Sequence, residues 1–417
     1  MRIWNAAYSA QPAEVVRVRS AREVSAAVRQ ARRSGLPLSV LGGGHDWAGR
    51  SVRPGALVID MSGMRTVVVG DGIAVFDGGA RALDVMEAAV DSGCSLVTGT
   101  QGSVGATGLA LGGGYGPMAG VGGLASDTIV GAEVVLADGS IVTVDDSHEP
   151  DLFWALRGGG GNFGVVTALR VELLSIPTVY TGTIMFHADQ AIDVLGDWID
   201  MAPTLPDELN VRPGLATGPD GTPVVYLVPT WAGDPAEGAA YFGRLESLGE
   251  PLLSQAAQAP LTEGLRTGDQ MYGLSDRSYV IRTRSLPMPE LTSAAVAALA
   301  KAAATRSSPL SAINMHHLHG AGVRVPADST AFANRRQHLM VEIIASWNEG
   351  DAAPHESWAE DTERLLDPYA LPGGYPNMIG PDRQQQAADA YGPNAPRLLS
   401  IKQRYDPDGV FSATPLP

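Results

Sequence analysis

The hydrophobic pattern of the N-terminal half predicts short strands and helices separated by glycine turns. Residues 14–18 alternate apolar and polar positions, and residues 21–35 have the spacing of an amphipathic helix that ends in glycine. Apolar runs predict further strands, and a helix that ends near Gly93 lies between two of them. An Asp-Gly pair predicts a hairpin, and a short helix, a glycine loop and a strand follow it. These elements cover 37–45, 56–62, 67–70, 73–79, 82–93, 132–144 and 151–174.

The pattern changes near Pro177, where glycine becomes less frequent and longer elements begin. Strands are predicted at 180–186, 223–231, 311–319 and 338–347, and helices at 189–202, 292–306 and 357–367. This succession is typical of an antiparallel sheet with helices on one face. The last stretch, 390–411, predicts a helix followed by a turn.

Length and composition narrow the class of protein. A chain of 417 residues favours two domains, and a formal net charge of −16 argues against a nucleic-acid partner or an anionic membrane surface. Cys94 is the single cysteine, so an intrachain disulfide and a cysteine-rich zinc site are excluded. The start of the chain has no apolar signal region, and no run of 18 apolar residues occurs. We therefore expect a soluble cytoplasmic protein.

Three glycine-rich segments carry the chemistry. GGGHDWAG at 42–49 follows a short apolar strand, eleven glycines crowd residues 99–123, and RGGGGNFG spans 157–164. Glycine allows the backbone to approach a ligand closely, and successive N–H groups in such turns form an anion-binding concavity. With so few side chains, we expect residues 99–123 to form a cradle rather than a helix or strand. Three such segments in one half of the chain, the first with a histidine, indicate a flavin enzyme.

Three other kinds of site, a dinucleotide-binding turn, a serine-hydrolase elbow and a metal site, agree less well with the sequence. The glycines at 112–116 do not open a long helix as a dinucleotide-binding turn would, and Gln101 replaces the first glycine of a hydrolase elbow around Ser103. His316, His317 and His319 suggest a metal, but no acidic residue stands at a familiar ligand spacing. On a strand, His317 and His319 share one face and His316 points to the other. We expect no metal.

These motifs resemble the FAD-linked oxidases of the vanillyl-alcohol oxidase superfamily, in particular the bacterial berberine-bridge-enzyme-like group. The resemblance rests on segments 41–49, 99–116, 124–139, 151–167 and 390–411. It implies an α+β fold with a PCMH-type FAD-binding domain and a substrate domain whose antiparallel sheet is covered by helices. The implied boundaries are 1–177 for the FAD-binding domain, 178–385 for the substrate domain, and 386–417 for a C-terminal segment that returns to the FAD domain.

The resemblance also implies how FAD is held. His45 occupies the position of the histidine that is bonded covalently to the flavin. Relatives with a second, cysteinyl bond have cysteine where this chain has Gln101, and Cys94 does not match that position, so a single bond is expected. Val104 matches a position near the flavin that is associated with oxygen access. The residues expected to contact FAD are Leu41, Gly42, Gly43, Gly44, His45, Asp46, Gly99, Gln101, Gly102, Ser103, Val104, Gly105, Gly108, Leu109, Gly113, Tyr115, Gly116, Leu124, Asp127, Gly161, Asn162, Gly164, Val165, Val166, Tyr391 and Asn394.

The catalytic base is less well defined. Several relatives have a tyrosine where this chain has Ala390, so that base does not transfer. The expected catalytic residues are Tyr375, Asn377, His319 and Glu342, with His317 and Tyr279 as further strand candidates. For each strand residue, a polar side chain on the outer sheet face is an equally good interpretation. Arg282 and Arg284 are candidates for an anionic substrate, although scattered arginines are mostly solvated.

The function that follows is an FAD-dependent oxidase. It would remove a hydride from a small hydroxylated substrate, a sugar or a secondary metabolite, and oxygen would reoxidise the flavin and give hydrogen peroxide. An amine remains possible as the group oxidised. Two alternatives stay open: a dehydrogenase that passes electrons to another acceptor, and a tailoring cyclase with a largely structural flavin. The sequence leaves the substrate and the oligomeric state open.

Overall fold

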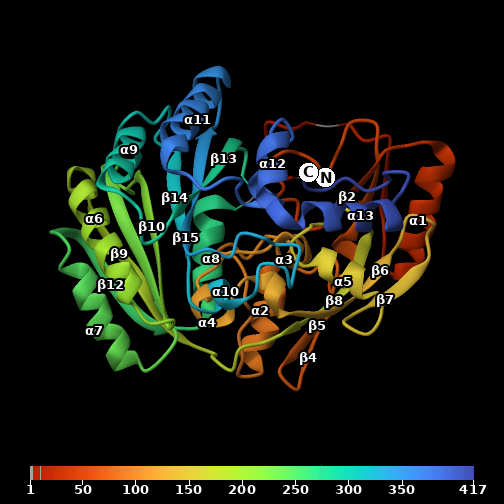
Figure 1. Cartoon of the computed structure of the whole chain (residues 1–417), viewed down its shortest axis with the longest axis horizontal. Coiled ribbons are helices and arrows are strands. Elements are labelled where there is room, and N and C mark those ends of the chain that lie inside the picture. The colour runs from red at the N-terminus through yellow and green to blue at the C-terminus, as the bar shows by residue number, and fades with distance from the viewer. Residues whose placement is uncertain (1–2, 10, 274) are drawn as a thin grey trace.

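The computed structural model describes residues 3–9, 11–273 and 275–417. Two groups of strands and helices lie side by side, with both chain ends in the group that contains the N-terminal sheets (Figure 1). Among the described residues, no helix has the length and apolar character needed to cross a membrane. The strands are β1 Glu14–Arg17, β2 Leu38–Leu41, β3 Leu57–Asp60, β4 Val67–Gly70, β5 Ile73–Asp77, β6 Ile129–Val135, β7 Ile141–Val144, β8 Val165–Glu172, β9 Val179–His187, β10 Leu209–Thr217, β11 Pro223–Trp231, β12 Pro251–Ala259, β13 Ser278–Pro287, β14 Ala312–Leu318 and β15 His338–Trp347.

The helices include several that begin or end at residues with a clear physical role. The Ser20 side chain accepts a hydrogen bond from the Glu23 N–H at the start of α1, and Gly35 ends that helix at φ 63°. The α-helices are α1 Ala21–Ser34, α2 Ala82–Asp91, α3 Ala106–Leu111, α4 Ala119–Gly122, α5 Pro150–Leu156, α6 Ala191–Met201, α7 Pro235–Glu246, α8 Leu261–Tyr272, α9 Ser293–Ala304, α10 Ala321–Arg324, α11 Ala353–Leu366, α12 Gln384–Tyr391 and α13 Ala395–Tyr405.

Two small sheets make up the N-terminal half. One is a parallel three-stranded sheet in the order β1-β3-β2, and the other is an antiparallel five-stranded sheet in the order β4-β5-β8-β6-β7. The hairpin predicted around Asp138-Gly139 is confirmed, because β6 and β7 pair antiparallel on either side of it. The strand β2 leads directly into the first glycine segment, so the sheet fixes where His45 lies.

The second half is dominated by one antiparallel sheet of seven strands in the order β12-β9-β11-β10-β14-β15-β13. Alternation along the strands separates its two faces. One face packs against α6, α7, α9 and α11 in a continuous core (Figure 1). The other face carries Tyr226, Asn314, His316 and Glu342 and is directed at the cavity described below. The expected α+β fold, with helices covering one face of an antiparallel sheet, is confirmed.

Several elements escaped the hydrophobic pattern. Helix α8 contains Gly264 and Gly268, which weaken a helical signal, and β10 contains Pro213 and Gly214, which interrupt a strand signal. The elements missed are β10, β12, β13, α4, α7, α8, α10 and α12. The expectation that residues 99–123 form no helix is wrong, because α3 and α4 lie within them and α3 buries Ala106 and Ala110.

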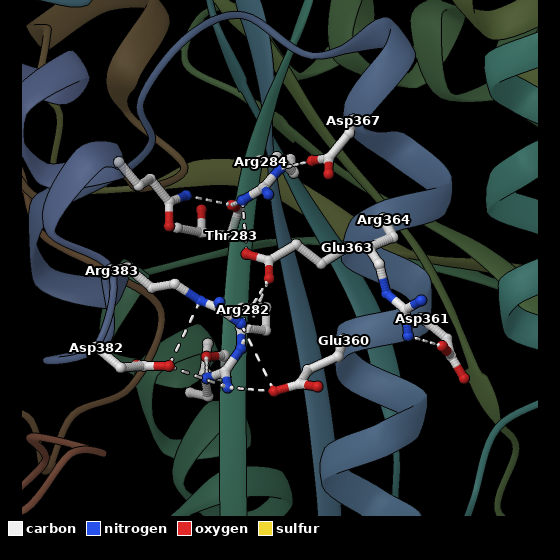
Figure 2. Close-up of polar contacts among 12 residues, drawn as sticks. Arg282, Thr283, Arg284, Glu360, Asp361, Glu363, Arg364, Asp367, Asp382 and Arg383 are labelled. Atoms are coloured by element: carbon white, nitrogen blue, oxygen red, sulfur yellow. Dashed lines mark hydrogen bonds and ion pairs between the residues drawn. The ribbon is translucent and has the colours of Figure 1, made fainter.

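Helix α11, the edge strand β13 and the segment before α12 are joined by a network of ion pairs (Figure 2). Glu363, whose side chain is 5% exposed, lies 2.6 Å from Arg284 and 3.0 Å from Arg383. Arg282 lies 3.5 Å from Glu360 and 3.8 Å from Glu363. The network connects the outer edge of the large sheet to Asp382 and Arg383, directly before α12.

Candidate active site

Two glycine segments from different parts of the chain meet backbone to backbone. A Cβ added to Gly43 would lie 2.1 Å from the Gly105 nitrogen, and one added to Gly105 would lie 2.6 Å from the Gly43 nitrogen. No real side chain tolerates such contacts, so glycine at both positions is required for the two loops to touch. The contact brings the loop of His45 against the loop of Gln101, Ser103 and Val104.

His45 takes part in a short hydrogen-bonded chain. Its Nε2 lies 2.9 Å from Ser103 Oγ, and Ser103 Oγ donates to Asp269 Oδ1 at 2.5 Å. Asp269 also accepts from the Ser103 N–H at 2.9 Å and comes from α8. Because the single Ser103 hydroxyl proton goes to Asp269, Ser103 Oγ accepts from His45, and Nε2 carries the imidazole proton. Burial lowers the pKa of His45 to about 4, against an opposing effect of Asp269, so the ring is neutral near pH 7 with a lone pair on Nδ1.

A cavity of about 1000 Å³ lies between the glycine loops, helix α8 and the polar face of the large sheet. This volume is at the upper end of ordinary ligand sites and accommodates a large cofactor together with a small molecule. A Cβ on Gly108 would meet no atom within 4 Å, and one on Gly42 would only graze Gly78 O at 3.9 Å. Both glycines line the cavity, so they provide the open backbone surface on which a cofactor lies, and the cavity fits FAD.

Many of the expected cofactor residues line this cavity. They come from the first glycine segment, the second glycine segment, and the loop that leads into β8. They are Gly42, Gly43, Gly44, His45, Asp46, Gly99, Gln101, Val104, Gly105, Gly108, Leu109, Tyr115, Gly161, Gly164, Val165 and Val166. Cys94 does not belong to the lining.

Other expected cofactor residues lie outside the lining and support it. Asn162 accepts a hydrogen bond from the Ala413 N–H, and its amide nitrogen donates to Thr414, so it holds the C-terminal tail against the glycine loop. Asp127 forms a buried ion pair with Arg335 at 2.7 Å. Ser103 acts through His45. The residues placed outside the cavity lining are Leu41, Gly102, Ser103, Gly113, Gly116, Leu124, Asp127, Asn162, Tyr391 and Asn394.

Tyr391 and Asn394, from the C-terminal segment, are both buried away from the cavity. Tyr391 belongs to the apolar core of the N-terminal half, and Asn394 donates to the carbonyl groups of Ala327 and Thr330. The structure gives both residues a packing role. The tail itself reaches the cavity through Ser412, Ala413 and Thr414, three residues that the sequence did not single out.

Three of the four expected catalytic residues line the cavity. Tyr375 Oη accepts hydrogen bonds from the Gly114 N–H at 3.0 Å and from Asn377 Nδ2 at 2.9 Å. Burial nevertheless raises the pKa of Tyr375 well above its usual value, and these two bonds oppose the shift. Glu342 Oε1 lies 3.6 Å from His316 Nε2. The cavity therefore contains a protonated phenol, a carboxylate and an imidazole that are available for proton transfer.

His319 is placed differently from the expectation. It does not line the cavity, because the strand directs His317 and His319 to one face, where their rings stack at 4.4 Å, and His316 to the cavity. The predicted alternation is confirmed, but the cavity-facing member is His316. Tyr279 does not line the cavity either: it lies on the same face of β13 as the lining residue Ile281 but is covered by Trp4, whose ring stacks on it at 3.7 Å.

Arg282 and Arg284 are not available to a substrate. Both belong to the ion-pair network with Glu363, on the side of β13 that packs against α11 (Figure 2). The sequence pattern missed Arg212, Tyr226 and Asn314 on the cavity face, and Asp269 on α8. The strands β11 and β14 were predicted, and the alternation of side chains along them was a signal that could have identified Tyr226 and Asn314. Arg212 and Asp269 lie in β10 and α8, which the hydrophobic pattern missed.

The fold and the cavity define a flavoprotein whose cofactor lies against glycine loops and beneath a sheet. Residues 12–145 match the FAD binding domain family, and residues 374–415 match the family described as berberine and berberine like. FAD-linked oxidoreductase aurO of Gibberella zeae is 30% identical, over 98% of this chain and 81% of its own length. The chain therefore belongs to the FAD-linked oxidoreductases of the berberine-bridge-enzyme-like group, and FAD is its cofactor.

Two further relatives describe the chemistry of this group. (R)-6-hydroxynicotine oxidase of Paenarthrobacter nicotinovorans is 28% identical, over 98% of this chain and 92% of its own length. The structure of glucooligosaccharide oxidase from Acremonium strictum, 25% identical, has a TM-score of 0.88 and covers 100% of this chain and 94% of that one. That enzyme carries a 6-S-cysteinyl, 8α-N1-histidyl FAD. Relatives of this chain are thus oxidases that act on hydroxylated compounds.

Proposed function

We propose that this enzyme is an FAD-dependent oxidase that removes a hydride from a hydroxyl-bearing carbon of a small molecule, with oxygen as the final acceptor and hydrogen peroxide as the product. The observation that carries the proposal is one cavity in which the His45 loop faces Glu342 and His316 on the large sheet and Tyr375 on the loop that precedes residues 376–378. Bound in this cavity, FAD supplies the two-electron acceptor. The relatives named oxidases support oxygen as the final acceptor.

We infer that FAD is attached through one covalent bond to His45. The neutral imidazole has its Nε2–H engaged by Ser103, which leaves Nδ1 as the nucleophilic nitrogen. Gln101 lines the cavity where bicovalent relatives have cysteine, and an amide offers hydrogen bonds rather than a bond to carbon. Val104 lines the same cavity, and its small branched side chain agrees with an open path for oxygen.

The side chains of the cavity have different roles toward the substrate. Glu342 is the group we assign to accept the hydroxyl proton, because its carboxyl group lines the cavity and the His316 imidazole lies 3.6 Å from it. Tyr375 retains its own proton and donates a hydrogen bond to the substrate oxygen, while Asn377 and the Gly114 N–H fix the phenol. A Cβ on Gly112 would lie 2.1 Å from Asn377 Oδ1, so glycine there lets Asn377 hold this position.

The cofactor-binding and substrate-binding residues come from different parts of the chain, which suggests domain boundaries. We propose that residues 1–177 with the returning segment 386–417 hold the cofactor, and that residues 178–385 hold the substrate. The large sheet begins at Val179, and α13 lies against α5 of the N-terminal half. Limited proteolysis of the holoenzyme near these limits, followed by mass spectrometry of the fragments, tests the proposed boundaries.

The central experiment combines an attachment assay and a reoxidation assay. After acid precipitation, the wild-type polypeptide is expected to stay yellow, whereas His45→Ala is expected to release its flavin. Photoreduced wild-type enzyme is expected to reoxidise rapidly in air and to form hydrogen peroxide. Flavin released from the wild type would contradict the attachment, and reduced enzyme that persists in air but reacts with a dye would show a dehydrogenase.

A further inference from the structure

Arg212 is a cation without a counter-charge on the substrate side of the cavity. It lies on β10 and lines the cavity, and its Nε is buried with no hydrogen-bond partner. Among the described residues, no carboxylate lies within ion-pair distance of its guanidinium group. A guanidinium group is always charged, and withdrawing it from bulk water without a partner is unfavourable.

Three other arginines near this region form ion pairs. Arg50, the second arginine of the cavity lining within the described residues, lies 2.5 Å from Asp46. Arg282 and Arg284 are paired with Glu363 outside the cavity. Arg157 and Arg306 also lack a carboxylate, but they donate hydrogen bonds to backbone carbonyl groups, whereas Arg212 has no hydrogen bond or ion pair with any other described residue.

Arg212 is surrounded by ordered polar side chains on neighbouring strands. A Cβ on Gly214 would lie 2.2 Å from the Tyr226 ring, so this ring covers Gly214. Gly214 is two residues from Arg212 on the same face of β10. Its hydroxyl donates to Asn314 Oδ1 at 2.6 Å, which fixes the ring. Gly214 pairs with Asn314, and Asn314 pairs with Glu342, so β10, β14 and β15 place Arg212, His316 and Glu342 on one face of neighbouring strands.

We propose that Arg212 binds the carboxylate of the substrate, so that the molecule oxidised is a hydroxy acid. The proposal rests on the proposed function and adds the substrate class to it. A planar guanidinium donates two parallel hydrogen bonds to a carboxylate. With its carboxylate on Arg212, a small hydroxy acid directs its hydroxyl group along the same face toward Glu342 and His316.

Electrostatics favours this pairing over a neutral ligand. Burial lowers the pKa of the Arg212 guanidinium, and the nearby Tyr226 and Glu342 oppose the shift. A bound carboxylate supplies the missing negative charge next to the guanidinium, where Glu342 does not come within ion-pair distance. A neutral amide of the same shape has only one acceptor oxygen, turns an N–H donor toward the guanidinium group, and leaves the charge unpaired.

The test compares matched acids and amides with the holoenzyme. Mandelate and mandelamide, and lactate and lactamide, are titrated anaerobically while the flavin absorbance records both binding and bleaching. The wild type is expected to bind at least one acid about tenfold more tightly than its amide, the size of a hydrogen bond to a charged group. Arg212→Gln is expected to lose this preference and Arg212→Lys to keep part of it. Arg364→Gln, an exposed arginine on α11, provides the charge-matched control.

The outcomes separate this inference from the oxidase itself. Equal binding of acid and amide, failure of both acids to bind, or a preference that survives in Arg212→Gln overturns the assignment. If Arg212→Gln leaves the preference intact but alters flavin retention, Arg212 serves the cofactor and the assignment is wrong. Reoxidation of the photoreduced enzyme in air is measured on the same samples. Slow reoxidation with an acid preference refutes only the oxidase, and fast reoxidation without that preference refutes only the hydroxy acid.

Discussion

At the scale of single residues, the chain Asp269–Ser103–His45 determines which imidazole nitrogen is free to react. The Ser103 hydroxyl proton is committed to Asp269, so the His45 proton stays on Nε2 and Nδ1 keeps its lone pair. This arrangement depends on a carboxylate at position 269. An amide there has its own N–H groups and permits Ser103 to donate to His45 instead.

We therefore expect Asp269→Asn to slow covalent attachment of FAD. The acid-stable flavin should accumulate about tenfold more slowly or worse, since the substitution removes a charged hydrogen bond that sets the tautomer. The measurement is the fraction of protein with acid-stable flavin against time after FAD is added. Asp361→Asn, at an exposed position on α11, should match the wild type. Attachment at the wild-type rate in Asp269→Asn, or a flavinyl peptide linked through Nε2, would disprove the tautomer argument.

At the scale of elements, α8 closes the cavity because it approaches the second glycine segment without an intervening side chain. A Cβ on Gly268 would lie 1.9 Å from the Thr100 carbonyl oxygen and 3.3 Å from Gln101 Cγ. Gly264, one turn earlier in the same helix, would meet nothing within 4 Å. The two glycines cost the helix similar propensity, but only Gly268 is required by packing.

This difference gives a matched pair of variants. Gly268→Ala is expected to push α8 away from Thr100, to lower the melting temperature and to weaken retention of noncovalent flavin in a His45→Ala background. In the flavin-free protein, Gly264→Ala is expected to raise the free energy of unfolding by up to about 1 kcal/mol, because alanine is the better helix former and the added methyl group meets no protein atom. Gly264 lines the cavity, so flavin release is compared only between Gly268→Ala and the parent protein. Thermal unfolding and flavin release measure both effects. Equal melting temperatures for the two variants would mean that α8 does not depend on this contact.

At the scale of the whole molecule, the ion-pair network joins the outer edge of the large sheet to the residues directly before α12 (Figure 2). Glu363 is its centre, with Arg284 at 2.6 Å and Arg383 at 3.0 Å. Removing the charge from this buried carboxylate leaves several guanidinium groups facing one another. A buried charge that loses its partner is strongly destabilising, in contrast to an exposed pair.

Glu363→Gln is therefore expected to lower the free energy of unfolding by about 3 kcal/mol. Asp361→Asn breaks the exposed pair with Arg364 on the same helix and is expected to change it by less than about 0.5 kcal/mol. Urea unfolding of both variants gives the comparison. If Glu363→Gln unfolds at the wild-type urea concentration, the network contributes nothing to stability.

Buried histidines give the molecule a defined response to acid. Burial lowers the pKa values of His319 and His338 to about 4, whereas an unfolded histidine titrates near about 6.5. Between these pH values the unfolded chain binds more protons than the native one, so stability falls as pH falls through this window. From pH 7 to pH 5 each histidine is expected to contribute a loss of about 2 kcal/mol.

His338→Gln tests this response, because glutamine does not titrate and its carbonyl oxygen can replace Nε2 as the acceptor of the Tyr115 hydroxyl, now 2.8 Å away. The urea midpoint of the variant should shift less between pH 7 and pH 5 than that of the wild type. A wild-type midpoint that rises on acidification would contradict the sign of the effect.

The sequence by itself determined the features that depend on local backbone chemistry. Glycine spacing indicated a flavin enzyme, the order of the loops and the position of His45. Backbone that approaches a cofactor closely requires glycine, and this requirement is visible in the sequence without knowledge of the fold. Strand alternation also separated His316 from His317 and His319, because that period is a property of one strand. It did not tell which face is turned to the cavity.

Only the tertiary structure decided the contacts that depend on register and on distant segments. Asp269 reaches Ser103 across 166 residues, from a helix whose glycines concealed it. Arg282 and Arg284 belong to an ion-pair network because α11 packs on their strand, while Arg212 faces the cavity unpaired. Strand order and helix packing decide which arginine has a carboxylate partner and which faces the cavity without one. Both arise from many weak long-range contacts that no local pattern encodes.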